Sequence, residues 1–321
     1  MAELTHPSYD QLRQVTPHAA VLLADNPGIF ELEGTNTFLL RDDPARREAI
    51  VVDPGPEDWD HSHRILEEAG TIAAILITHR HGDHTDGLAK LLEKIDAPVY
   101  AMDPVWCRGT EPLKDGDAIT GAGVTVTTLA TPGHTTDSVC FVLGEPDAPE
   151  AVLTGDMILG RGTTVVSYPD GELGPYLESM ERLQALGDIA VLPAHGPELP
   201  SIADVAAFYL EHRRGRLAQV QSARAELGLD KTAREIVERV YTDVPETAKR
   251  GAAMMTKAQL LYLDTLDGRE PQTGRLAYAS EAEVADEEQF RAQMQATSAK
   301  TLEQKRATWA ANEAARAAAG A

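Results

Sequence analysis

The first two thirds of the chain alternates short apolar runs with amphipathic stretches. The runs are typical of buried strands and span Ala19–Leu23, Thr37–Leu40, Ala49–Val52, Ala73–Ile77, Val99–Ala101, Val124–Leu129, Phe141–Leu143, Ala151–Leu153 and Ile189–Ala194. Between them the pattern predicts helices over Glu57–Ala69, Leu88–Ile95, Pro175–Leu186 and Ser201–His212, and mostly loop over Val105–Gly123. Strands that alternate with helices predict an α/β protein.

Five of the runs lead into a histidine or an aspartate, most of them beside a glycine. These residues are Asp53, His79, His134, Asp156 and His195. Sites in α/β proteins lie outside the carboxyl ends of strands. Any one of the five has an ordinary structural explanation, but their recurrence at predicted strand ends favours a shared site.

The densest polar cluster is THRHGDH at residues 78–84. On extended backbone His79 and His81 point the same way because they are two residues apart. The following glycine lets the chain bend before Asp83 and His84. Neutral imidazoles and carboxylates are ligands of zinc and similar divalent ions. A solvated polar loop is the alternative, and four ligand-type residues at a strand end make it the weaker one.

Together these residues resemble the metallo-β-lactamase superfamily of hydrolases, from about residue 26 to residue 195. The resemblance is closer to the lactamase-beta-two-like branch, whose best-described member is a mitochondrial endoribonuclease; some polyketide thioesterases are similar to the same branch. Its motifs are Asn26-Pro27-Gly28, Gly34-Thr35-Asn36-Thr37, Thr131-Pro132-Gly133-His134, Gly155-Asp156-Met157-Ile158-Leu159-Gly160, Gly162-Thr163-Thr164 and His212-Arg213.

The resemblance implies an αβ/βα sandwich that binds two divalent metal ions, preferably Zn²⁺. It assigns His79, His81 and His134 to one metal and Asp83, His84 and His195 to the other, with Asp156 bridging. Two such ions hold a shared hydroxide at neutral pH and polarise the electrophile that it attacks. Catalytic roles are expected for Asp83 and for Asp53, which would hold a ligand histidine by a hydrogen bond.

Substrate-side roles are a weaker implication for Asn36, Thr37, Thr163 and Thr164, for which turn or capping roles are an equal alternative. Tyr168 and His212-Arg213-Arg214 are candidates to meet an anionic group, although Arg213 and Arg214 are equally well explained as a helix-surface pair. His61 and His63 lie two apart on a predicted helix, so we interpret them as solvated.

The resemblance also implies a small winged-helix domain after the catalytic domain. We therefore expect three regions: a catalytic domain over residues 1–213, a winged-helix domain over 214–279 and a mobile Ala/Glu-rich tail over 280–321. In the second region the pattern predicts three helices. The first spans Arg216–Leu227, the second begins at a capping box formed by Thr232 to Glu235, and the third spans Lys249–Leu266. Arg275–Ala279 would be the strand of the wing.

The formal net charge is −22, and all of this imbalance falls on residues 1–213, with 13 basic and 35 acidic groups. A negative surface repels polyanions at long range, although it also serves solubility. Two cysteines suit a reducing compartment. With no apolar run near the roughly 20 residues of a membrane span, we expect a cytoplasmic protein that does not bind membranes.

Three functions are compatible with these patterns. The first is cleavage of single-stranded RNA by the metal-bound hydroxide, the second is hydrolysis of a small ester or thioester, and the third is non-enzymatic binding through the winged helix. All seven metal ligands are present, which disfavours the third. Two-zinc lactamases of this superfamily usually carry a cysteine where Asp156 stands, so β-lactams are not expected substrates.

Overall fold

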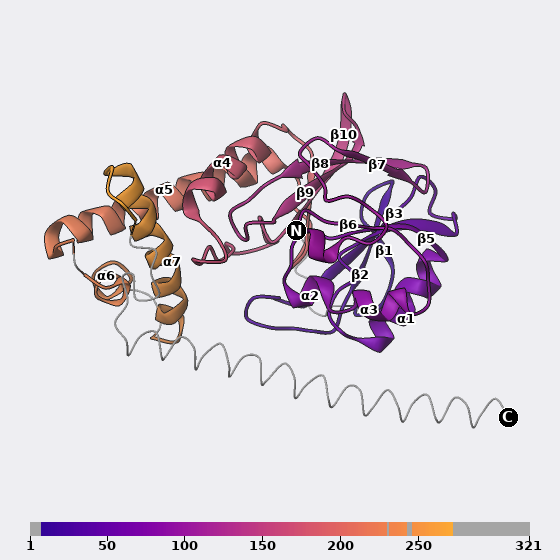
Figure 1. Ribbon diagram of the computed structural model, residues 1–321, viewed down its shortest axis with the longest axis horizontal. Coiled ribbons are helices and arrows are strands. Elements are labelled where there is room, and N and C mark those ends of the chain that lie inside the picture. The colour runs from indigo at the N-terminus through magenta and orange to yellow at the C-terminus, as the bar shows by residue number, and fades with distance from the viewer. Residues whose placement is uncertain (1–7, 230, 243–245, 272–321) are drawn as a thin grey trace, which may run out of the picture.

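Two β-sheets packed face to face form the centre of the molecule in the computed structural model, which describes residues 8–229, 231–242 and 246–271 (Figure 1). The first sheet has the order β1-β2-β3-β4-β5-β6, with β1 Arg13–Gln14, β2 Ala19–Leu23, β3 Asn36–Leu40, β4 Glu48–Val52, β5 Thr71–Leu76 and β6 Val99–Tyr100. The second has the order β11-β10-β9-β8-β7, with β7 Ala118–Gly121, β8 Val124–Ala130, β9 Val139–Glu145, β10 Ala148–Gly155 and β11 Ala190–Pro193. Strands β4, β5 and β6 are parallel, as are β10 and β11.

Helices cover the outer faces of both sheets. On the first sheet lie α1 Trp59–Ala69 and α3 Leu88–Leu92, and the short helix α2 Gly82–Thr85 precedes α3. The 3₁₀ helix η1 Pro104–Trp106 follows β6. The second sheet is covered by α4 Leu173–Gln184 and by the first half of α5 Ile202–Leu227. Helices α6 Ala233–Val240 and α7 Glu246–Leu266 complete the described chain.

Side chains that point alternately to the two faces of each strand explain why the sheets are covered on both sides. Phe38 and Ile50 of the first sheet point inward and share one buried cluster with Phe141 of the second. Their neighbours Leu39 and Val51 point outward and are buried under the helices. Because side chains alternate between the two faces of a strand, each sheet is apolar on both faces. The αβ/βα sandwich is therefore confirmed.

One prediction about secondary structure is incomplete and another is wrong. Val105–Gly123 is mostly loop, as predicted, but its last part contains strand β7, which pairs antiparallel with the following strand β8. Only Ile119 of this four-residue strand is buried, so its alternation is too short to recognise. The separate helices predicted over Ser201–His212 and Arg216–Leu227 are one continuous helix, α5. Gly215 lies inside it at a cost of about 1 kcal/mol, which the buried residues on either side offset.

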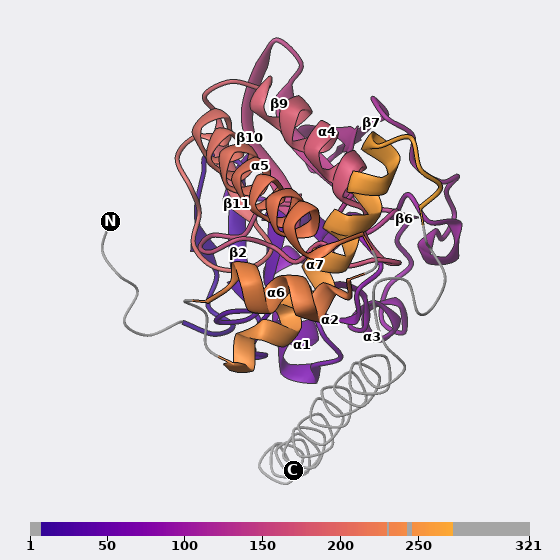
Figure 2. The ribbon, with the colours of Figure 1, turned by 90° about the vertical axis from the view of Figure 1, so that its left-hand side faces the viewer.

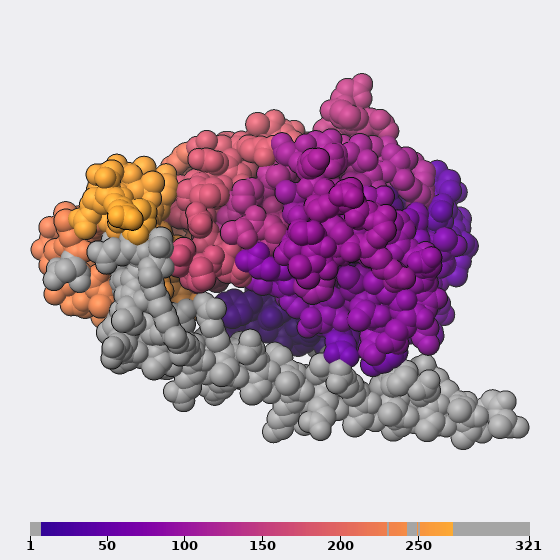
Figure 3. Space-filling model, viewed as in Figure 1, coloured from indigo at the N-terminus to yellow at the C-terminus, as the bar shows by residue number. Residues whose placement is uncertain are grey.

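The second half of α5 packs with α6 and α7 at one end of the molecule (Figures 2 and 3). Val220, Ile236 and Leu260 belong to the apolar cluster that joins the three helices. The capping box of Thr232 and Glu235 is confirmed. The predicted wing strand Arg275–Ala279 and the tail 280–321 lie outside the described residues, so the winged helix and the division at residue 213 stay predictions. Of the helices described, none is long and apolar enough to cross a membrane.

Candidate metal centre

The ends of strands from both sheets meet at one edge of the sandwich. Gly155 at the end of β10 has a φ of +50°, and a Cβ there would lie 2.7 Å from the hydroxyl of Thr78, two residues after β5. Only glycine allows this approach without strain. It brings Asp156, the next residue after β10, close to His79, the residue that follows Thr78.

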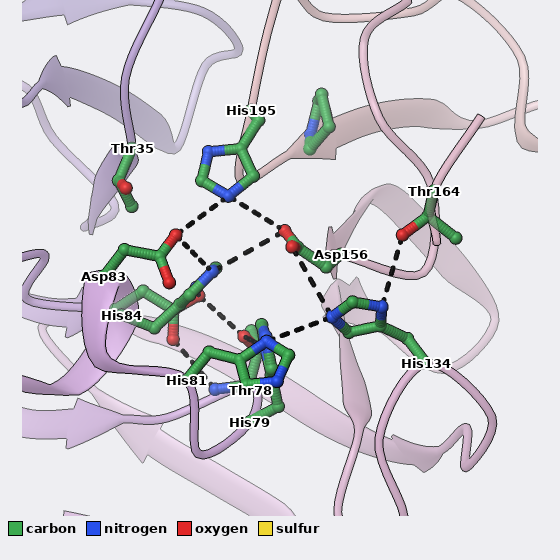
Figure 4. Close-up of polar contacts among 12 residues, drawn as sticks. Thr35, Thr78, His79, His81, Asp83, His84, His134, Asp156, Thr164 and His195 are labelled. Carbon is green, nitrogen blue, oxygen red and sulfur yellow. Dashed lines mark hydrogen bonds and ion pairs between the residues drawn. The ribbon is translucent and has the colours of Figure 1, made fainter. Parts of the chain in front are cut away.

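Seven side chains gather at this edge, and their ligand-type atoms form two groups (Figure 4). Within each group, one atom from every residue lies within 4.8 Å of the others. They come from the segment after β5, from α2, and from the segments that follow β8, β10 and β11. The first group is His79, His81, His134 and Asp156, and the second is Asp83, His84 and His195.

In the first group, three imidazole nitrogens point at one another. Nδ1 of His81 lies 3.0 Å from Nε2 of His79 and 3.2 Å from Nε2 of His134. Oδ2 of Asp156 lies 3.6 Å from the same nitrogen of His134. Since all four atoms face one small space, a single cation can contact all of them.

The second group has the same character with more negative charge. Oδ2 of Asp83 lies 3.2 Å from Nε2 of His84 and 3.1 Å from Nε2 of His195. The other carboxylate oxygen of Asp156, Oδ1, lies 3.2 Å from Nε2 of His195 and 3.6 Å from Nε2 of His84. The carboxylate of Asp156 therefore faces both groups, with one oxygen toward each.

Each of the five histidines has an oxygen beside the ring nitrogen that points away from the cluster. The contact distances are 3.1 Å for His79 with Thr78 Oγ1, 2.6 Å for His81 with Asp170 Oδ2, 2.9 Å for His84 with Asp53 Oδ2, 2.8 Å for His134 with the Val165 carbonyl and 3.1 Å for His195 with the Gly34 carbonyl. A carbonyl or carboxylate there accepts the ring N–H and so leaves the lone pair on the inner nitrogen, the form that binds metal.

Asp53 contacts His84 on the side of the ring that faces away from the cluster, the position predicted for it. It is buried, and its Oδ1 accepts a hydrogen bond of 2.8 Å from the backbone N–H of Thr78. Its Oδ2 accepts from the Thr78 hydroxyl at 2.7 Å and lies beside Nδ1 of His84. These contacts place the buried Asp53 carboxylate behind the ring of His84.

Burial and neighbouring imidazoles lower the pKa of two histidines of the first group, His79 and His134. Burial and then the charge of His84 lower the pKa of His79 well below its ordinary value. Burial also lowers the pKa of His134. A divalent ion binds histidine only when the imidazole is neutral.

The carboxylates reverse this effect in the second group. Burial alone would lower the pKa of His195, but Asp156 and Asp83 outweigh it and raise that pKa to about 10. Burial is likewise outweighed at His84, where Asp83 and Asp53 raise the pKa well above its ordinary value. Protons on these imidazoles balance the carboxylates in the metal-free protein, and a bound divalent cation would displace them.

Two buried atoms show that the cluster fits a metal. Nε2 of His84 and Oδ1 of Asp156 are buried and make no hydrogen bond of good geometry within the described ranges, although each lies 3.2–3.6 Å from an oppositely charged group. Both atoms face the inside of the cluster, where a divalent ion would satisfy them, so the donor set fits the proposed metals.

The residues predicted on the substrate side differ in their surroundings. Asn36 is buried, and its side-chain amide donates to the carbonyls of Pro193 and Gly196. The buried Thr37 hydroxyl donates to the Asp53 carbonyl at 2.6 Å. Thr164 is also buried, and its hydroxyl lies 3.3 Å from Nδ1 of His134. These three side chains have supporting contacts, whereas Thr163 is partly exposed.

The prediction of a solvated His61 is wrong. This imidazole is fully buried, with Nε2 2.9 Å from the Thr37 hydroxyl and Nδ1 2.7 Å from Oδ1 of Asp10. Helical spacing alone pointed it away from the core, but Asp10 returns from the N-terminal segment to cover it. His63 is exposed, as expected.

Arg213 and Arg214 do not form a surface pair. Arg213 is buried; it donates to the Thr164 carbonyl and lies over the ring of Tyr176, with 5.3 Å from Cζ to the ring centroid. Arg214 is exposed and pairs with Glu181 at 2.5 Å. Tyr168 is partly buried and packs against the cluster of α5, α6 and α7. Arg213 therefore ties α5 to the loop behind His134.

Asp170 is a part of the site that the sequence patterns do not reveal. Its carboxylate binds both His81 and Arg80, the residue between two histidines of the first group. It lies in an ordinary turn sequence, Tyr168-Pro169-Asp170-Gly171, so neither its type nor its spacing distinguishes it from a solvated loop residue.

Comparison with known families agrees with this geometry. Residues 31–195 match the family described as the metallo-beta-lactamase superfamily. This segment covers about half of the chain and contains all seven side chains of the two groups. The chain belongs to the metallo-β-lactamase superfamily.

Curated relatives extend the similarity over most of the chain. It is 34% identical over 274 residues to the lactamase-like protein vrtG of Penicillium aethiopicum, a match that covers 81% of this chain and 85% of the relative. It is 36% identical over 259 residues to an atrochrysone carboxyl ACP thioesterase of Aspergillus chevalieri, covering 77% and 80%.

Solved structures share the fold. A metallo-beta-lactamase family protein from Thermus thermophilus superposes with a TM-score of 0.61 at 23% identity, over 78% of this chain and 94% of that one. A beta-lactamase domain protein from Burkholderia ambifaria gives a TM-score of 0.64 at 25% identity, over 82% and 92%.

Proposed function

We propose that this protein is a metal-dependent hydrolase of acyl thioesters or esters. The observation that carries the proposal is the placement of Asp156, whose two carboxylate oxygens face two separate groups of ligand atoms. Relatives named as thioesterases, at 36% and 32% identity over about three quarters of the chain, support an acyl substrate.

Two divalent ions held by these groups would supply Lewis acidity and would make hydroxide available near neutral pH. The chain's own residues prepare the site for them. The oxygens behind the five histidines hold each ring's orientation, and four of the five rings are buried. Asp83, whose side chain is 22% exposed, is the most accessible carboxylate of the two groups and is placed to take or return a proton during turnover.

Charge favours an acyl substrate over RNA. Phosphate contacts need local positive charge, and residues 1–213 carry 13 basic against 35 acidic groups. Two arginines near the described site are already engaged by carboxylates: Arg80 by Asp137 and Asp170, and Arg161 by Glu33. RNA cleavage, our first expectation from the sequence, therefore has weaker support than hydrolysis of an ester or thioester.

One set of assays tests the proposal. Purified protein loaded with Zn²⁺ should hydrolyse a small acyl-thioester reporter, a chelator should abolish turnover, and neither labelled single-stranded RNA nor a β-lactam should be consumed. Asp156→Asn should lower kcat/KM by more than about 100-fold, since even residues that only support a metal ligand contribute about 10- to 100-fold. His63→Ala, at an exposed position, should match the parent protein.

Two results would contradict the proposal. Thioester hydrolysis that persists both with the chelator and in Asp156→Asn would show that the reaction does not need the metal. Chelator-sensitive cleavage of RNA by protein that does not hydrolyse thioesters would show that the function is that of a ribonuclease.

A further inference from the structure

His81 is the least enclosed histidine of the two groups. Its side chain is 34% exposed, whereas the other four histidines are buried. It precedes α2 as the N-cap residue, yet its side chain makes no capping hydrogen bond. The ring therefore depends on other contacts to keep Nδ1 turned toward His79 and His134.

Asp170 supplies that contact from a distant part of the chain. Its Oδ2 lies 2.6 Å from Nε2 of His81, on the outer side of the ring, and its Oδ1 accepts from Arg80. A carboxylate at this position accepts the Nε2–H and so leaves the Nδ1 lone pair facing the first group.

Arg80 holds this carboxylate in place. Besides Asp170 it donates to Oδ1 of Asp137 at 2.6 Å and to the hydroxyl of Thr136 at 3.0 Å. Asp137 lies three residues after His134, so Arg80 connects the loop that carries one ligand candidate to the loop that carries Asp170. Asp137 and Asp170 are alike as acceptors for Arg80, but of the two only Asp170 has a hydrogen bond to His81 among the described contacts.

We infer that Asp170 is a positioning residue that orients His81 toward the metal of the first group. The inference rests on the proposed metal dependence. It follows that loss of the Asp170 carboxylate weakens binding at the group of His79, His81 and His134 and leaves the group of Asp83 and His195 unaffected, because Asp170 reaches the centre through His81.

Metal titration of the metal-free full-length protein tests this directly. The protein is titrated with Zn²⁺ against a competing chelator, and in parallel with Co²⁺, whose visible spectrum reports the ligands of each ion. Asp170→Ala should weaken one of two binding steps by about 10- to 100-fold and leave the other unchanged. Asp170→Asn keeps the shape and an acceptor oxygen, so it should give a smaller loss at the same step, and it replaces the alanine variant if that one does not fold.

Asp137→Asn is the matched control, because it makes the same chemical change on the other side of Arg80. It should leave both binding steps within about threefold of the parent protein. An equal loss in Asp137→Asn and Asp170→Asn would show that the Arg80 network acts only on local structure and would overturn the inference. So would two unchanged binding steps in Asp170→Ala. If the parent protein binds no metal, the proposed function fails first and this inference falls with it.

Discussion

Nδ1 of His61 lies 2.7 Å from Oδ1 of Asp10, and the imidazole between Asp10 and Thr37 has no exposed surface. Thr37 in turn donates to the carbonyl of Asp53. A hydrogen-bonded chain thus runs from the N-terminal segment, through α1, to the residue that orients His84. The chain connects His61, which is not one of the seven ligand candidates, to Asp53 behind His84.

We expect His61→Ala to lower the free energy of unfolding by about 2–4 kcal/mol, because it leaves a cavity and two polar groups without their partner. The matched control is His63→Ala, on the same helix but exposed, with an expected change below about 0.5 kcal/mol. Urea unfolding followed by circular dichroism measures both. Equal stability of the two variants would contradict the role of His61.

Asp53→Asn tests the support of His84. Asp53 has a φ of +51°, a conformation that asparagine also tolerates, so the backbone should keep its shape. An amide N–H in place of Oδ2 would donate to Nδ1 of His84 and move the ring proton to Nε2, the atom that faces Asp83 and Asp156. Metal affinity at the second group should fall by about 10- to 100-fold.

Isothermal titration with Zn²⁺ measures that affinity, and Asp60→Asn, on the outer side of α1, is the control that should bind as the parent protein does. A normal second binding step in Asp53→Asn would show that His84 needs no carboxylate behind it.

The sequence predicts the sheets and the candidate ligands for the same reason, which is that both depend on local pattern. Strand β5 is a six-residue segment that is apolar after its first residue, and His79 follows its end by three residues. Partners distant in sequence leave no such trace. Asp10 lies 51 residues from His61 and Asp170 lies 89 from His81, so only the folded chain shows why either carboxylate matters.

The sequence fails to predict that α5 is one continuous helix for a related reason. Gly215 weakens the local propensity for helix, and only the packing of the flanking residues against α4, α6 and α7 carries α5 through it. Local propensity is informative where a segment is long and periodic, and tertiary contacts decide the remaining positions.

Metal removal should destabilise the protein measurably. Ions that bind only the folded state add about 2.7 kcal/mol at a free concentration 100 times Kd for each site. We therefore expect the melting temperature to fall on chelation and to recover with two equivalents of Zn²⁺. Asp156→Asn should bind fewer than two ions and show a smaller shift, because Asp156 faces both groups. A melting temperature unaffected by chelator, in protein shown to have lost its metal, would argue against ligation within this buried cluster.

The last prediction concerns alkaline pH. Burial raises the pKa of the Cys140 thiol to about 12, from an ordinary value of 9.0, and its partner Thr131 offsets only part of this effect. The folded state therefore holds a proton that the unfolded state releases above pH 9. The stabilisation is fully present below that pH and is lost as the pH rises toward 12, by an amount on the order of 4 kcal/mol for this group.

Cys140→Ser isolates the effect, because serine keeps an acceptor for the Thr131 hydroxyl and does not ionise in this range. Urea unfolding at pH 7 and pH 10.5 should show a smaller loss of stability in Cys140→Ser than in the parent protein. The native protein at pH 8 should also leave Cys140 unmodified by a thiol reagent that labels both cysteines after denaturation. Rapid labelling of Cys140 in the folded protein, or an identical pH dependence in the two proteins, would contradict a buried, protonated thiol.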